Sequence, residues 1–146
     1  MNLLQRVEER AEDLDHLFKS VDQLICVYLF GSQLSRPSDL SDIDFGLLFD
    51  RLTSRTELFM RQLESIDKIS AILSTDKVDR VILNHAPPLL SYNIIKGVVI
   101  YCRNEEERVK FETRVIDTYL DLEKIYSEYK NALFEAIRSW GAKDDD

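Results

Sequence analysis

The sequence predicts an α/β domain: a small mixed β-sheet covered by helices and followed by a long C-terminal helix. Short apolar runs, typical of buried strands, alternate with longer segments in which apolar residues recur every three or four positions. The chain has 146 residues, 45 % of them hydrophobic, which is enough for one domain with a substantial core. We therefore expect a single domain over residues 1–146.

The N-terminal half is expected to run helix, strand, strand, helix. Residues 3–20 carry apolar side chains at three- and four-residue steps, which predicts one amphipathic helix packed on the sheet. Residues 24–30 are continuously apolar and predict a buried strand that ends at Gly31-Ser32. A polar loop over residues 33–41 leads into a second strand, residues 42–49, and residues 55–73 return to helical spacing.

The C-terminal half adds two more strands and two more helices. Residues 78–83 predict a third strand, and Pro87-Pro88 stops it and opens a helix to residue 96. A short strand at 98–101 precedes a helix over about 105–140, which we expect Gly141 to end. Apolar residues recur at alternating four- and three-residue steps from Val115 to Trp140. A helix of this length extends farther than packing on one compact domain requires. We expect the aromatic end of this helix to contact a partner.

Charge and composition exclude several classes of protein. The formal net charge of −8 argues against direct nucleic-acid binding, which needs a basic surface. The charged N-terminus has no signal-peptide pattern, and no apolar run is long enough to span a membrane. Cys26 and Cys102 lie in or beside apolar runs and are expected to be reduced, buried residues. These features predict a cytoplasmic protein.

A candidate site surrounds the turn between the first two strands. Gly31-Ser32 follows a strand and offers backbone N–H groups and a hydroxyl to phosphate oxygens. Asp42 and Asp44 are two apart on an extended chain and therefore face the same side. Paired carboxylates are the ligands with which proteins hold Mg²⁺ beside a substrate phosphate. One half of this site thus suits phosphate and the other half suits the accompanying metal.

The pattern Gly31-Ser32…Asp42-Ile43-Asp44 resembles the signature of the DNA polymerase β-like nucleotidyltransferases, in particular the minimal nucleotidyltransferase (MNT) domains. The resemblance extends over roughly residues 24–121. Nine residues separate Ser32 from Asp42, one fewer than the family usually has, and Leu34-Ser35-Arg36 replaces the familiar Ala-Arg-Gly. The resemblance implies the nucleotidyltransferase fold, ATP as substrate and two Mg²⁺ ions.

The resemblance also implies a third metal-binding carboxylate on a later strand, and Asp79 is the position that matches. Asp79 shares a strand face with Val81 and Leu83; an ion pair with Arg80 or another surface cation is the alternative reading. His85 follows the same strand and is expected near Asp79. Arg36 could neutralise the leaving pyrophosphate.

The branch of the family implies a biological role. MNT antitoxins transfer AMP from ATP to a tyrosine of a HEPN-type RNase toxin and so neutralise it. Two other functions remain open from the residues alone: a non-catalytic antitoxin that acts by binding, and a nucleotidyltransferase that modifies a small molecule such as an antibiotic. The intact Asp42, Asp44 and Asp79 favour catalysis over binding alone.

Overall fold

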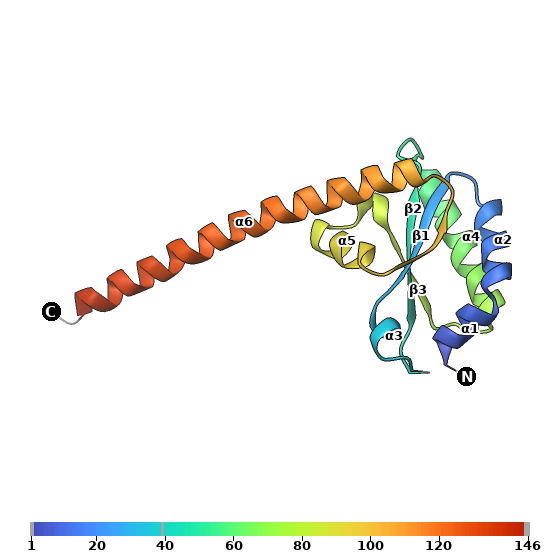
Figure 1. Cartoon of the computed structure of the whole chain (residues 1–146), viewed down its shortest axis with the longest axis horizontal. Coiled ribbons are helices and arrows are strands. Elements are labelled where there is room, and N and C mark those ends of the chain that lie inside the picture. Colours follow the sequence, from blue (N-terminus) through green and yellow to red (C-terminus); the bar gives the residue numbers. More distant parts are fainter. Residues whose placement is uncertain (1, 39, 145–146) are drawn as a thin grey trace.

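A computed structural model describes residues 2–38 and 40–144, the last three of these by their backbone only. It confirms the predicted fold class: one four-stranded mixed sheet with helices on both faces and a long C-terminal helix (Figure 1). The elements are α1 (Leu3–Glu9), α2 (Ala11–Ser20), β1 (Leu24–Phe30), α3 (Ser32–Ser35), β2 (Ile43–Phe49), α4 (Arg55–Leu73), β3 (Val78–Ile82), the 3₁₀ helix η1 (Leu83–His85), α5 (Pro88–Ile95), β4 (Val98–Cys102) and α6 (Glu105–Asp144).

The sheet has the strand order β3-β2-β1-β4. β1 pairs with β2 and β4 in antiparallel fashion, whereas β2 and β3 run parallel. β1 and β2 are central and almost entirely buried, which explains their continuous apolar sequences. β3 and β4 are the edges. Within the described residues, no helix is both apolar enough and long enough to cross a membrane.

Each face of the sheet has its own apolar core. Helices α1, α2 and α4 cover one face, and α5 with the first turns of α6 covers the other (Figure 1). Tyr28, fully buried on β1, donates a hydrogen bond of 2.7 Å to Glu112 of α6, and Arg108 pairs with the same carboxylate at 3.0 Å. This polar contact fixes the start of α6 against the sheet.

The structure corrects several boundaries predicted from the sequence. The helix predicted over residues 3–20 is broken at Arg10, where φ is −102° and ψ is 17°. The break lets Leu3 and Val7 on α1, and Phe18 on α2, contribute to the same core. The predicted loop 33–41 begins with a helical turn, α3. Gly141 does not end α6, which continues to Asp144.

The expected burial of the two cysteines is confirmed for Cys26, whereas Cys102 is only partly buried. Cys26 and Cys102 are direct partners on β1 and β4, their sulfur atoms are 3.1 Å apart, and both are free thiols. Cys26 is fully buried, and burial raises its pKa well above the ordinary value. The pair therefore packs as two small apolar side chains between neighbouring strands.

Candidate active site

The turn after β1 is built around Gly31. Its φ of +90° with ψ of −166° belongs to a region that essentially only glycine occupies. A Cβ atom at this position would overlap the carboxylate oxygen Oδ2 of Asp44. Asp44 is paired with Phe30, the residue immediately before the glycine. The backbone of Gly31 and the carboxylate of Asp44 are therefore in direct contact across the β1–β2 pair.

Ser32 begins α3 and is exposed. The first N–H groups of a helix have no partner inside it, so the Ser32 and Gln33 amides are available at this turn. Ser32 directly follows Gly31, the residue that approaches Asp44. Arg36 ends α3, is exposed, and donates its backbone N–H to the Ser32 carbonyl at 2.8 Å.

The structure brings two of the three predicted carboxylates together. Asp44 and Asp79 are direct register partners on the parallel strands β2 and β3, so they occupy the same face of the sheet. Asp42 is exposed and precedes β2, which begins at Ile43 rather than at Asp42 as predicted. The pKa of the Asp44 carboxyl is raised, first by burial and then by the negative charges of Asp79 and Asp42.

Asp79 lies on an edge strand and is exposed. Its Oδ1 accepts the backbone N–H of Arg80 at 2.8 Å, and the Arg80 guanidinium is 3.9 Å away. The surface contact with Arg80 weighed in the sequence analysis is therefore present. It is a long, exposed ion pair of the kind that contributes little to stability, so it leaves the carboxylate accessible to a ligand.

His85 was wrongly expected near Asp79. It belongs to η1, which follows the far end of β3. The side chain of the neighbouring Asn84 pairs with the backbone of Phe49 on β2. Its Oδ1 accepts from Phe49 N at 2.9 Å, and its Nδ2 donates to Phe49 O at 2.8 Å. Phe49 is five residues beyond Asp44 along β2, or roughly 16 Å of extended chain. The parallel direction of β3 thus carries His85 away from the carboxylates.

Gln33 is a residue that the sequence analysis missed. It is fully buried, and its side-chain amide makes three hydrogen bonds within the loop: Nε2 donates to the carbonyls of Ser38 at 2.6 Å and Ser41 at 2.7 Å, and Oε1 accepts from Ser38 N at 2.9 Å. Gln33 therefore holds together the two ends of the loop that joins the Gly31-Ser32 turn to Asp42. A polar residue in a polar loop gave no sequence signal of this burial, apart from its position next to the Gly-Ser pair.

Replacing Gln33 with leucine should destabilise the protein by about 2 kcal/mol or more, because buried backbone groups of Ser38 and Ser41 would lose their partners. Chemical denaturation with urea would measure the change. As a control, Ser35→Ala removes only an exposed 3.3 Å hydrogen bond in the same turn and should have a much smaller effect. Equal stability of Gln33→Leu and the wild type would contradict the structural role of this glutamine.

The carboxylates fit a metal ion that is shared with a substrate. No group of three or more His, Cys, Asp or Glu side chains in the described part of the chain is arranged as a ready-made metal cage. Mg²⁺, however, is usually held by one or two carboxylates, with water and substrate phosphates completing its shell. Asp42, Asp44 and Asp79 supply hard oxygen donors of this kind, beside a turn that can hold phosphate.

The family model for the polymerase β nucleotidyltransferases matches residues 12–106, more than half of the chain. The chain belongs to the polymerase β nucleotidyltransferase family. The matched region contains the Gly31-Ser32 turn and all three predicted carboxylates. The protein is thus a nucleotidyltransferase, as the sequence predicted, and the site described above lies where its fold brings β1, β2 and β3 together.

Solved structures share the fold of this nucleotidyltransferase. One is a complex of a tri-AMPylated HEPN toxin of Shewanella oneidensis with an MNT antitoxin. The matched chain is 20 % identical in sequence, and the match covers 87 % of this chain and 98 % of that chain with a TM-score of 0.62. A toxin–antitoxin structure with AMP-PNP has 22 % identity, the same coverage of both chains and a TM-score of 0.63. The MntA–HepT toxin–antitoxin has 19 % identity, again the same coverage, and a TM-score of 0.62. No significant match was found among curated proteins.

Proposed function

We propose that this nucleotidyltransferase is an antitoxin that transfers AMP from ATP to a tyrosine of a HEPN-type RNase and thereby silences it. The observation that carries the proposal is the contact of Gly31 with Asp44, beside the register partner Asp79. This arrangement combines a phosphate-binding turn with adjacent carboxylates. Support for the partner comes from the structural neighbours, which include an MNT antitoxin in complex with an AMPylated HEPN toxin and a toxin–antitoxin complex with AMP-PNP.

In the proposed reaction, each residue of the site has a role. The Ser32 hydroxyl and the amides of the Gly31-Ser32 turn bind the β- and γ-phosphates of ATP, with Arg36 beside them. Asp42 and Asp44 bind Mg²⁺ together with the triphosphate, and Asp79 contributes to a second ion. Bound Mg²⁺ would neutralise phosphate charge and lower the pKa of the acceptor hydroxyl.

The acceptor chemistry suits a phenol. The tyrosine oxygen forms a bond to the α-phosphorus of ATP, the bond from that phosphorus to the bridging oxygen breaks, and pyrophosphate leaves. A phenol, with an unperturbed pKa of about 10, gives up its proton more easily than an aliphatic alcohol. Asp79 is exposed at the edge of the sheet, where an acceptor from a partner protein can reach it. The net charge of −8 would attract a basic, RNA-binding partner.

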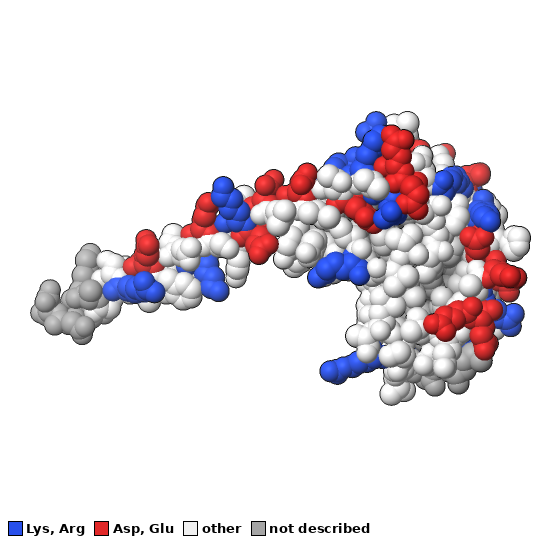
Figure 2. Space-filling model, in the orientation of Figure 1, with Lys and Arg blue, Asp and Glu red and all other residues white. Residues whose placement is uncertain are grey.

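The rival proposal is an antitoxin that works by binding alone, and α6 is the observation that favours it. Beyond its first turns α6 extends away from the domain, with charged side chains scattered along it among uncharged ones (Figures 1 and 2). Apolar side chains on this part are largely exposed, including Tyr126 at 67 % and Trp140 at 67 %. Such an aromatic surface is typical of a protein interface.

An in vitro assay separates the two proposals. The protein, ATP labelled at its α-phosphate, Mg²⁺ and a cognate HEPN RNase are incubated together, and label on the RNase is measured alongside RNA cleavage. Catalytic neutralisation predicts labelled, inactive RNase with the wild type and unlabelled, active RNase with Asp42→Asn. Equal inhibition by both forms without label would support neutralisation by binding.

Removing the exposed part of α6 should weaken binding of the RNase while binding of ATP by the domain persists. Either truncation after Asp121 or Trp140→Ala would test this, because the carboxylates lie in the domain and Trp140 lies near the helix end. Glu128→Ala, an exposed change on the same helix outside the apolar stripe, serves as the control. Capture of the partner at full strength by the truncated chain would refute a docking role for α6.

A further inference from the structure

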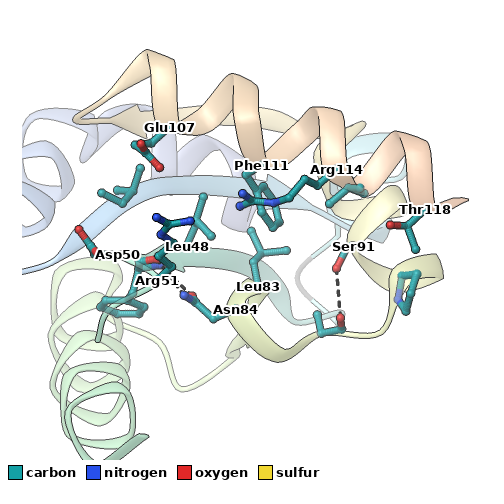
Figure 3. A pocket seen from close by; sticks show the side chains of 15 residues that line it. Leu48, Asp50, Arg51, Leu83, Asn84, Ser91, Glu107, Phe111, Arg114 and Thr118 are labelled. Carbon is teal, nitrogen blue, oxygen red and sulfur yellow. Dashed lines mark hydrogen bonds between the residues drawn. The ribbon is translucent and has the colours of Figure 1, made fainter. Parts of the chain in front are cut away.

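A second cavity lies at the opposite end of β2 from the carboxylates. It has a volume of about 280 Å³ and is enclosed by the end of β2, the η1–α5 segment and α6 (Figure 3). Its floor is apolar and consists of buried side chains: Leu48, Leu83, Phe111 and Val115. The six residues from Asp44 to Asp50 span roughly 20 Å of extended chain, so this cavity is separate from the proposed triphosphate site.

Two arginines from different elements line this cavity. Arg51 follows β2 in a turn and Arg114 lies on α6, and Figure 3 shows both guanidinium groups turned into the cavity. Within residues 2–38 and 40–144, neither guanidinium has an ion pair or a side-chain hydrogen bond. Two cations that share one cavity repel each other, and a bound anion would relieve that repulsion.

Asp50 and Glu107 also line the cavity, but within the described residues neither carboxylate forms an ion pair with Arg51 or Arg114. Asp50 Oδ1 accepts the backbone N–H of Leu52 at 2.9 Å and so caps the turn. Glu107 Oε1 lies 3.6 Å from Lys110 Nζ, one turn farther along α6. The cavity thus combines an apolar floor with two guanidinium groups whose N–H donors are available to a ligand.

The chemistry of the lining defines the ligand. One guanidinium can satisfy both oxygens of a carboxylate, whereas the three terminal oxygens of a phosphate monoester can accept from two guanidinium groups at once. Phe111 lines the cavity but is only 8 % exposed, so it offers apolar contact to the edge of an aromatic group. A volume of about 280 Å³ suits a compact ligand. We infer that this cavity binds a small aromatic phosphate monoester, the class that includes nucleoside 5′-monophosphates.

A titration of the full chain tests this inference. Isotope-labelled protein in EDTA is titrated with phenyl phosphate, with AMP and with inorganic phosphate, and backbone amide shifts are followed by NMR. We expect saturable shifts at Leu83, Ser91 and Phe111 with the two aromatic esters. Arg51→Gln and Arg114→Gln should each weaken this binding at least tenfold. Both arginines are exposed, so both variants should fold; thermal unfolding would confirm it.

Matched controls make the outcome decisive. Arg138→Gln changes an exposed arginine on the distant part of α6 and should bind as the wild type does. Shifts confined to Gly31 and Ser32 would place the ligand at the other site and overturn the inference. Absence of binding at millimolar ligand, or unchanged affinity in both arginine variants, would overturn it as well. Equal affinity for inorganic phosphate and phenyl phosphate would exclude the aromatic subsite.

Discussion

Replacing Asp44 with asparagine is expected to reduce nucleotide transfer at least about 100-fold while leaving the fold intact. The variant would lose a carboxylate proposed to bind the metal, and metal stabilisation of transition-state charge is worth several kcal/mol, with about 1.4 kcal/mol for each tenfold. Transfer of label from ATP to the partner measures the loss. Asp67→Asn, an exposed change on α4, is the matched control and should retain full activity.

The same variant should unfold at a slightly higher temperature than the wild type at neutral pH. The pKa of Asp44 is raised in the folded protein by burial and by the charges of Asp79 and Asp42, so its ionised form costs stability. That cost is absent below the unfolded-state pKa of about 3.9 and grows as the pH rises through the folded-state pKa. The difference in unfolding temperature should therefore disappear in acid. A variant that transfers nucleotide at the wild-type rate would refute the assignment of Asp44.

Gly31→Ala should lower both the stability and the transfer activity of the protein. The added Cβ would overlap Asp44 Oδ2, and a backbone with φ of +90° and ψ of −166° is strained for any residue with a side chain. We expect a loss of about 1–3 kcal/mol in unfolding free energy, together with a large loss of transfer activity. Thermal unfolding and the transfer assay measure the two effects separately.

The control for this change is Gly141→Ala, which adds the same methyl group where no atom lies within 4 Å. Gly141 is inside α6, so alanine should be neutral there or stabilise the helix by up to about 1 kcal/mol. Equal stability and activity of Gly31→Ala and Gly141→Ala would show that the close contact between Gly31 and Asp44 is not needed.

The sequence predicted those parts of the fold that depend on local patterns. β1 and α4 have the predicted bounds, because a continuous apolar run and a long helical spacing each identify one element without help from the rest of the chain. The neighbouring positions of Asp44 and Asp79 also agree with the expectation that both belong to one site. Their roles in catalysis stay predictions.

The remaining features depend on contacts between distant segments. No local sequence pattern predicts that β3 runs parallel to β2. Because the two strands are parallel, His85, which follows β3, lies at the opposite end of the sheet from the carboxylates. The burial of Gln33 depends on a loop that closes around its amide, and the break at Arg10 lets two short helices share one core. The arginines of the second cavity, Arg51 and Arg114, are 63 positions apart and meet only in the folded chain.

The proposed function is tested most directly by the mass of the partner. The cognate HEPN RNase is co-expressed with the wild-type chain or with the Asp44→Asn variant, purified, and analysed by intact and peptide mass spectrometry. We predict a gain of one or more AMP units on a tyrosine with the wild type and none with the variant. A partner that is unmodified yet equally inhibited by both forms would contradict AMP transfer and establish neutralisation by binding.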